Sequence, residues 1–352
     1  MNKSRAIGFG ILIVLLGGII FAAWNWPSWQ SRLVTGGDST APGKALQPLK
    51  IRIMDGLSVH SLHVLVAEKK GLFAEAGLEA EVSYCAIGKF CMDALNSGGV
   101  DFAGVVEMNI AQTLFTHDDI AILTEYSQPI RAVKFLGRAD RGIKTIADLE
   151  GKKIGVFFGV NIHVFAVRAL QAAGVPLDTV ELINLKPPEA AAAFISGSID
   201  AVVTWQPIVD SILQKVGEHT IMLTDDAERY WSWKLIIATR RSYLEKHAEE
   251  AKRLVRAIIE ADSFIANHPE EAYAIFAQAR DLEANKVALF ASEIEYRVQI
   301  TPRLIEMIDF ETRWLPEYLP QFFGGKQPVT RDIRSLIAPI LKDIKPDAWK
   351  LN

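Results

Sequence analysis

Cysteine is scarce in this sequence, since its 352 residues include only Cys85 and Cys91. A densely disulfide-bonded scaffold is therefore excluded, and the chain is long enough to bury a core without one. The 38 Lys and Arg against 42 Asp and Glu leave no basic excess, which argues against binding to nucleic acid or a polybasic role at a membrane surface. These absences leave a mildly acidic globular chain that we expect to form about two lobes.

Charge is also missing from a long N-terminal stretch, residues 6–30, which follows Lys3 and Arg5. A positive start before an apolar run is typical of an export signal. The apolar run exceeds the roughly 7–15 residues of an ordinary signal core. Three tryptophans follow it, as in an aromatic belt at a membrane interface, at positions 24, 26 and 29.

We therefore expect residues 1–30 to form an uncleaved hydrophobic helix that anchors the chain on the periplasmic side of the bacterial inner membrane. A cleaved signal and a soluble periplasmic protein is the alternative. No cysteine directly follows the run, which excludes a lipoprotein anchor. Residues 31–48 are rich in Gly, Ser, Thr and Pro and predict a flexible tether.

The two cysteines leave two interpretations open. Cys85 ends an expected strand and Cys91 falls in the first turn of an expected helix, so a disulfide is geometrically possible and two buried thiols are the alternative. A metal site is not expected, because no Cys/His cluster of ligand spacing accompanies them. His60 and His63 could share a metal, although a structural role is the simpler interpretation.

Short apolar strands alternate with helices along the body of the chain. Expected strands at 50–54, 80–84 and 101–106 are separated by helical patterns, and a second round begins near Arg141. This rhythm predicts an α/β fold with mostly parallel sheets and helices on both faces. The tail from Ser242 onward is predicted to be nearly all helical.

One internal repeat suggests two similarly built lobes. Ser-Gly-Gly-Val-Asp at 97–101 recurs as Ser-Gly-Ser-Ile-Asp at 196–200. In each copy the glycine can end a helix in a left-handed turn, and the aspartate can cap the entry to a strand. The repeat aligns Glu107 with Gln206 at the carboxyl ends of equivalent strands, where open α/β sheets bind ligands. Glu107 would then meet Trp205 and Gln206 across a cleft, unless Trp205 is simply a core aromatic.

Five stretches in consistent order resemble the nitrate/taurine-type periplasmic solute-binding proteins, which include aliphatic-sulfonate and thiamine-pyrimidine-precursor binders. The first carries Ala67, Gly71-Leu72-Phe73 and Gly77-Leu78, similar to the pattern A-x-x-x-G-L-F-x-x-x-G-L. The other stretches lie at 94–102, 146–156, 201–207 and 266–272.

The resemblance implies a two-lobed, type II periplasmic-binding-protein (Venus-flytrap) fold with a helical C-terminal region. Lobe 1 would combine 49–138 with 235–352, and lobe 2 would be 139–234. Segments near 134–138 and 235–239 would form the hinge. The implied function is non-catalytic capture of a small solute in the cleft and its delivery to the subunits of an ABC permease, without a cofactor, a metal or nucleic acid.

The resemblance also implies ligand-binding residues at the ends of strands. They are Ser58, Val59, His60, Gly88, Glu107, Met108, Tyr126, Gly159, Asn161, Trp205, Gln206, Trp231 and Trp233. Helix N-termini near Phe90 and Asn161 would suit anions such as sulfonate or nitrate.

Glu107 departs from an anion site, because a carboxylate there would repel the ligand. Together with the aromatic residues it favours a cationic, nitrogenous or heteroaromatic solute, bound in part by cation–π contacts. The alternatives are that Glu107 points to solvent and caps its own helix, or that the solute is a sulfonate- or nitrate-type anion.

Two other function classes stay open. The fold also serves thiamine-pyrimidine synthases, for which His60 could be read as the active-site histidine, but their cysteine-rich motif is missing. No G-x-S-x-G elbow, H-E-x-x-H pair or P-loop occurs either, so an enzyme is not expected. A membrane-tethered periplasmic sensor or partner-presenting protein on the same fold is the main alternative.

Overall fold

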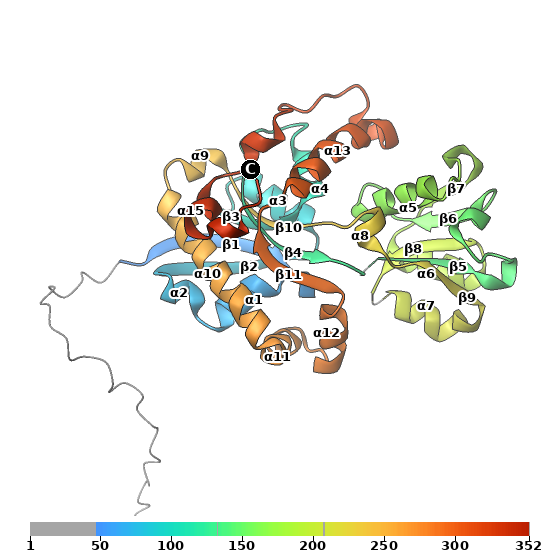
Figure 1. The fold of residues 1–352 in the computed structure, drawn as a ribbon, viewed down its shortest axis with the longest axis horizontal. Coiled ribbons are helices and arrows are strands. Elements are labelled where there is room, and N and C mark those ends of the chain that lie inside the picture. The colour runs from blue at the N-terminus through green and yellow to red at the C-terminus, as the bar shows by residue number, and fades with distance from the viewer. Residues whose placement is uncertain (1–46, 132, 207, 352) are drawn as a thin grey trace, which may run out of the picture. The chain divides into compact units, whose positions relative to one another are not determined.

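The computed structural model of the chain describes residues 47–131, 133–206 and 208–351. The predicted anchor at 1–30 and nearly all of the predicted tether at 31–48 lie outside these ranges. Of the helices within them, none is both long and apolar enough to cross a membrane. The described elements gather around two sheets, visible as two groups in Figure 1, which we call the six-stranded and the five-stranded lobe.

The six-stranded lobe is built on a mixed sheet. β1 pairs in parallel with β2 and β3, whereas β10, β4 and β11 extend the sheet by antiparallel pairing. In spatial order the strands are β11 (Ile294–Gln299), β4 (Ala121–Pro129), β10 (Leu235–Thr239), β3 (Phe102–Val106), β1 (Leu49–Gly56) and β2 (Leu78–Cys85).

The five-stranded lobe is also mixed. β6 pairs in parallel with β7 and β8, and β5 pairs antiparallel with β8 and β9. In spatial order the strands are β7 (Glu181–Asn184), β6 (Lys153–Val156), β8 (Ala201–Trp205), β5 (Val133–Arg138) and β9 (Thr220–Thr224). The prediction of mostly parallel sheets is therefore wrong. A parallel neighbour needs a crossover within the same sheet. Instead, β4 leads directly into β5 of the other sheet, and β9 leads into β10 of the other sheet through the short helix α8.

Helices cover both sheets. In the six-stranded lobe, α1 packs against α10 and α11, while α3 packs against α4; in the five-stranded lobe, α6 packs against α7 and α5 contacts α8. The helices of the α/β part are α1 (Leu62–Lys69), α2 (Leu72–Glu75), α3 (Gly88–Asn96), α4 (Glu107–Thr113), α5 (Asn161–Ala172), α6 (Pro187–Ser196), α7 (Ile208–Val216) and α8 (Ala227–Tyr230).

The C-terminal part is mainly helical, as predicted, but it also supplies a strand. β11 adds to the edge of the six-stranded sheet beside β4, so the prediction of a nearly all-helical tail misses 294–299. Its helices are α9 (Arg241–Leu244), α10 (Ala248–Asn267), α11 (Pro269–Arg280), α12 (Ala284–Ala291), α13 (Pro302–Tyr318), α14 (Pro320–Phe323) and α15 (Ile340–Ile344).

The two segments expected to form the hinge are strands within the sheets. Val133–Arg138 is β5 of the five-stranded lobe, and Leu235–Thr239 is β10 of the six-stranded lobe. All eleven residues of these strands are buried, including Lys134 and Arg138. Their apolar side chains gain more from burial inside a sheet than from crossing between lobes. The connections between the lobes therefore lie before β5 and, around α8, before β10.

The repeated pentapeptide forms the same structure in both lobes. Gly98 and Gly197 end α3 and α6 with φ of +77° and +76°, as predicted. The carboxylate of Asp101 accepts the backbone N–H of Arg52 at 2.9 Å, and that of Asp200 accepts the N–H of Lys153 at 2.9 Å. Each aspartate therefore holds the next parallel strand in register.

An arginine completes each copy of this motif. Arg52 binds Asp101 at 2.7 Å and the carbonyl of Gly98 at 3.1 Å. Arg141 binds Asp200 at 2.6 Å and the carbonyl of Gly197 at 2.5 Å. The sequence repeat thus reflects one physical device used twice, which is a bidentate arginine clamp on a helix-to-strand turn.

The hydrophobic core is unequally divided between the lobes. One continuous cluster runs through the six-stranded lobe and on through α5 to β6, β8 and β5. A second, small cluster lies under α6 and α7, and it consists of Leu136, Ala190, Ala191, Phe194, Ile199, Val202, Val209 and Ile212. The α5 face of the five-stranded lobe therefore shares its core with the other lobe.

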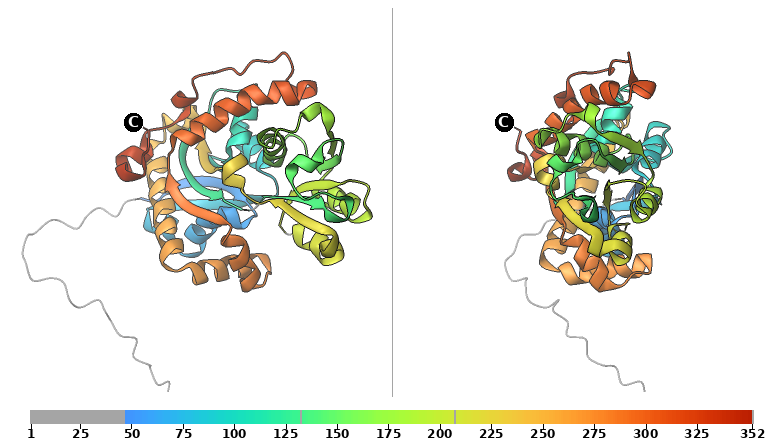
Figure 2. Two further views of the ribbon diagram at one scale, coloured as in Figure 1. Left: turned by 45° about the vertical axis from the view of Figure 1, so that its right-hand side comes forward. Right: turned by 90° about the vertical axis from the view of Figure 1, so that its right-hand side faces the viewer.

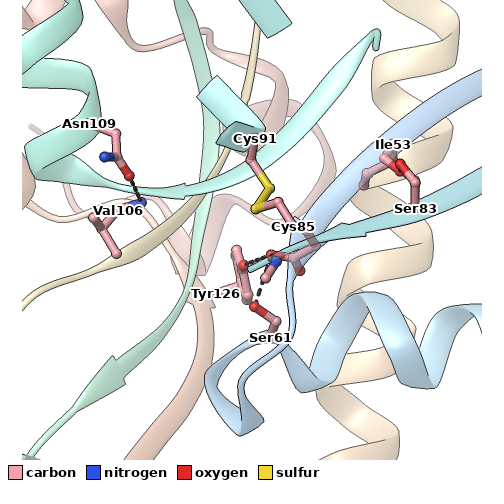
Figure 3. The surroundings of a disulfide bond; sticks show 10 residues. Ile53, Ser61, Ser83, Cys85, Cys91, Val106, Asn109 and Tyr126 are labelled. Carbon is pink, nitrogen blue, oxygen red and sulfur yellow. Dashed lines mark hydrogen bonds between the residues drawn. A yellow bond between two sulfur atoms is a disulfide. The ribbon is translucent and has the colours of Figure 1, made fainter. Parts of the chain in front are cut away.

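The structure joins Cys85 and Cys91 in a disulfide. Figure 3 shows the bond next to Ser61 and Tyr126, whose hydroxyl groups both donate to Asp55. The bond ties the end of β2 to the first turn of α3, so it closes a short loop beside the end of β1.

We predict that reducing this disulfide destabilises the folded chain by about 2 kcal/mol, because the cross-link lowers the conformational entropy of the unfolded chain. Urea unfolding with and without a reductant measures the effect. Cys85→Ser with Cys91→Ser is the matched control, and it should unfold as the reduced chain does with or without reductant. Equal stability of the oxidised and reduced chains would contradict the prediction.

Candidate functional site

A cavity of about 480 Å³ lies between the two lobes. Its walls come from the turn after β1, the start of α5, the end of β8, the segment before β10 and the α11–α12 region. The lining residues are Leu57, Ser58, Val59, His60, Val160, Asn161, Ile162, Trp205, Gln206, Trp233, Phe276, Arg280, Leu282, Phe290 and Glu293. The volume is in the range of small-molecule sites, which are mostly apolar with a few polar groups.

Seven of the residues singled out in the sequence line this cavity. They are Ser58, Val59, His60, Asn161, Trp205, Gln206 and Trp233. They come from both lobes. The alignment of Glu107 with Gln206 is correct, because each residue directly follows the last residue of its strand, β3 or β8. Trp205 is half-buried, so it packs on the core and also borders the cavity.

The other six do not line it. Gly88 begins α3, and Gly159 lies before α5, where its carbonyl accepts a hydrogen bond from Gln112 at 2.9 Å. The remaining four are buried in the core or the seam between the lobes, namely Glu107, Met108, Tyr126 and Trp231.

Both expectations for Glu107 are wrong. Its side chain is 0% exposed, so it does not point to solvent, and it does not meet Trp205 or Gln206. Its two carboxyl oxygens accept the side-chain N–H of Asn161 at 2.8 Å and the backbone N–H of Lys234 at 2.6 Å. The carboxylate therefore supports a residue of the cavity wall from behind.

Sequence reasoning missed the wall that α11 and α12 supply. Phe276, Arg280, Leu282, Phe290 and Glu293 come from the C-terminal part, which lies outside the repeat that located the strand ends. The available sequence signal for this wall was an expected helix that ends at Arg280. In the structure Asp281 follows it in the left-handed conformation.

Arg280 is the cavity's unneutralised cation. No carboxylate forms an ion pair with it among the described residues, and its Nε is buried without a hydrogen-bond partner. Its guanidinium lies 4.5 Å from the ring centroid of Tyr84, a cation–π contact that holds it in place. Asp55 lies further inside, where burial raises its pKa to about 7 and the charge of Arg280 opposes that rise.

Glu293 brings a carboxylate to the same cavity, but Lys134 compensates it. The ammonium of Lys134 lies 2.6 Å from Oε1 of Glu293 and 3.6 Å from Asp225. Among the described residues that line the cavity, Arg280 is thus the cation without an ion pair.

His60 adds a neutral polar group. Burial lowers its pKa to about 4, its Nε2 is buried without a partner, and its Nδ1 lies 3.3 Å from Oγ of Ser58. Its ring lies 5.7 Å from that of Trp233. The predicted alternative of a metal shared with His63 does not fit, since His63 Nε2 is bound to Asp262 at 2.9 Å. In the described ranges, no group of three or more His, Cys, Asp and Glu could hold a metal ion.

The start of α5 is held against the six-stranded lobe by a packed seam. His163 stacks on Phe158 at 4.3 Å between ring centroids and meets Trp314 of α13 edge-on at 4.9 Å. Figure 2 shows α13 running along the six-stranded lobe towards the helices of the other lobe. The seam fixes the cavity residue Asn161, which lies two residues before His163.

A family model described as NMT1/THI5 like matches residues 59–272. The chain belongs to the NMT1/THI5-like family. The match spans both lobes, from the turn after β1 into α11. It includes the cavity residues from Val59 to Trp233, but neither Leu57 and Ser58 nor the wall supplied by α11 and α12.

Named relatives agree with this membership. A candidate aliphatic sulfonates-binding protein of Escherichia coli is 27% identical over 82% of this chain and 89% of its own length. A candidate binding protein of Brucella abortus is 29% identical over 60% of this chain. The chain spans 66% of the length of that Brucella relative.

The structure is also similar to a solved structure of a sulfonate-binding protein. The crystal structure of the periplasmic aliphatic sulphonate binding protein of Escherichia coli superposes with a TM-score of 0.69 at 21% identity, over 80% of this chain and 91% of the other. This likeness shows the periplasmic-binding-protein fold of the two lobes, as the sequence resemblance implied.

We predict that His163 makes the protein sensitive to acid. Burial lowers its pKa to about 4 from the ordinary 6.5, so the unfolded chain binds the proton more tightly. Stability is therefore lost as the pH falls below about 6.5, by up to about 3 kcal/mol near pH 4. His163→Phe keeps the stack on Phe158 and should remove that part of the loss.

Urea unfolding of both proteins between about pH 7 and pH 4 measures the difference. The exposed His219 offers a matched control, because His219→Phe should leave the acid dependence as it is in the wild type. An unchanged acid dependence in His163→Phe would show that the ring does not stay neutral.

Proposed function

We propose that this protein captures a small solute in the cavity between its lobes and delivers it to an ABC permease, without catalysis. The observation that carries the proposal is the cavity itself, with walls from both lobes and volume for one small molecule. Closure of two lobes around a ligand is the movement that such an arrangement supports. Membership of the family and the relatives named for binding are consistent with it.

The solute we propose is an aromatic or heteroaromatic molecule with an anionic group. Trp205, Trp233, Phe276 and Phe290 offer flat apolar surface to a ring. Arg280 offers an unneutralised guanidinium to a carboxylate, sulfonate or similar group. The unpartnered Nε2 of His60 can pair with a ring nitrogen or N–H. Glu107 does not favour a cationic solute, because it is buried and does not line the cavity.

Binding without catalysis is supported by the polar groups of the cavity. Ser58 and His60 form a nucleophile–base contact, but it is long, at 3.3 Å, and no carboxylate orients the other ring nitrogen. With a pKa of about 4, His60 is also a weak base at neutral pH.

For the location, we propose the periplasmic side of the bacterial inner membrane, with residues 1–30 retained as an anchor. The support is the uncharged run and its three tryptophans. Retention would keep the binding lobes near the permease. The alternatives are a soluble periplasmic protein after signal cleavage, and a tethered sensor or partner-presenting protein.

We predict that N-terminal sequencing of the protein purified from cell membranes starts at or near Met1. A start after Ala23 would indicate cleavage and a diffusible protein. Washing the membranes with salt or carbonate should leave the uncleaved protein bound, since an inserted helix is not released by loss of electrostatic attraction.

The solute class is tested by calorimetry with three probes. Benzenesulfonate has a ring and a charge, benzenesulfonamide has the ring without the charge, and ethanesulfonate has the charge without the ring. We expect benzenesulfonate to bind most tightly. Arg280→Gln should weaken it about 10- to 100-fold, the value of a charge-assisted hydrogen bond, and should change benzenesulfonamide little.

Arg313→Gln is the matched control, because Arg313 is an exposed arginine of α13 whose side chain is 71% accessible. Equal affinity for the sulfonate and the sulfonamide would contradict the anionic class. Absence of binding for these probes and for a wider solute panel would favour the sensor or partner-presenting alternative.

A further inference from the structure

Two carboxyl groups are buried next to each other where α13 packs on α4, beside the start of α5. Glu107 begins α4, Glu311 lies in the middle of α13, and both are 0% exposed. Glu107 has its two hydrogen bonds, from Asn161 and Lys234. Neither oxygen of Glu311 meets a hydrogen-bond partner of good geometry. A buried carboxylate in that position would be uncompensated, so Glu311 is the group that carries a proton.

The buried surroundings of Glu107 and Glu311 disfavour ionisation of both carboxyl groups at once. Burial raises the pKa of Glu107 to about 7, against the opposing hydrogen bond from the backbone of Lys234. Burial also raises the pKa of Glu311 well above its usual value, and the charge of Glu107 raises it further. Two adjacent carboxyl groups in a low dielectric cannot both ionise, so near neutral pH the pair holds one proton.

The cations around the pair are engaged elsewhere. The ammonium of Lys234 lies 2.9 Å from Glu125. The guanidinium groups of Arg168 and Arg303 lie 5.6 and 5.4 Å from the ring centroid of Trp231. None forms an ion pair with Glu107 or Glu311 among the described residues. The titratable groups on the elements packed against the pair are thus Lys234, Glu125, Arg168, Arg303, Tyr230 and the neutral His163.

The pair reaches the cavity through one residue. Asn161 is the first residue of α5, belongs to the five-stranded lobe and lines the cavity, while its amide donates to Glu107 of the six-stranded lobe. We propose that Glu107 and Glu311 are positioning residues that form a proton-dependent link between the lobes and hold Asn161 at the cavity wall. The consequence for solute capture rests on the proposed function; the link itself does not.

The direction of the pH effect follows from where the proton binds. The folded seam keeps the proton of Glu311 at pH values where an unfolded glutamate has lost it. Stability therefore falls as pH rises above the ordinary value of about 4.5, by up to tenfold in the folding constant per pH unit for one proton. Above the raised pKa the two charges repel, and separation of α5 from α4 and α13 relieves the repulsion by admitting water.

Glu311→Gln tests the link in the full chain, without a solute. Glutamine has the same shape, can donate an N–H to Glu107 and has no proton to lose. In urea unfolding between about pH 5 and pH 9, the folding constant of the wild type should fall as the pH rises. In Glu311→Gln the fall per pH unit should be smaller, by a factor of up to tenfold. Hydrogen exchange at the start of α5, corrected for intrinsic rates, should rise with pH only in the wild type.

Glu317→Gln is the matched control, because it makes the same change at an exposed position of α13 and should behave as the wild type. Asn161→Ala should speed hydrogen exchange at the start of α5 at every pH, because its hydrogen bond to Glu107 is lost. It should keep the pH slope of stability, because both carboxyl groups remain. A wild-type pH slope in Glu311→Gln would overturn the proposal.

A second measurement covers the case in which Glu311→Gln does not fold. Asp55, whose pKa is also raised to about 7, is first replaced in Asp55→Asn so that it adds no band of its own. Infrared difference spectra of this variant between about pH 5 and pH 9 should contain the carbonyl band of a protonated carboxyl group that disappears on deprotonation, because exposed carboxyl groups are already ionised near neutral pH. Absence of such a band above neutral pH would overturn the proposal, since the pair would then hold no proton.

Discussion

The seam between α5 and the six-stranded lobe is the constraint on which the cavity depends. Gln112 donates to the carbonyl of Gly159, Asn161 donates to Glu107, and Gln171 donates to the Tyr318 hydroxyl, so α5 is held before its start, at its start and near its end. The continuous hydrophobic cluster passes through the same seam. With α5 fixed on this side, its first turn and the α11–α12 region bound the space that is left for a solute.

Much of the fold could be predicted because its turns are local. The glycine and aspartate of each repeated pentapeptide act within one helix-to-strand turn, and the structure has both turns as expected. The strand directions could not be read in the same way. β11 is a six-residue strand after four helices, and it pairs with β4, more than 160 residues earlier, because the sheet edge is free there. The sequence of residues 294–299 does not indicate that β4 is the pairing strand.

The residues of the candidate site also differ in whether local sequence could predict them. Ser58, Asn161 and Trp205 were predicted because the family resemblance implies ligand contacts at the ends of strands, and a strand end has a fixed place in an α/β sheet. Arg280 and Glu293 were missed because they come from helices whose position is set by packing of the tail. Glu107 was placed correctly along the chain but misread, since its position after β3 does not reveal that Asn161 and Lys234 enclose it.

The small hydrophobic cluster under α6 and α7 has a consequence for how the molecule comes apart. Its eight residues, which include Phe194 and Ile212, share no apolar cluster with the rest of the core. A face with its own small core can open as a local unit at lower free energy than the whole. We therefore expect the outer layer of the five-stranded lobe to open before α5, which belongs to the main cluster. We also expect transient exposure, and with it proteolytic cleavage, to begin on the face away from the seam.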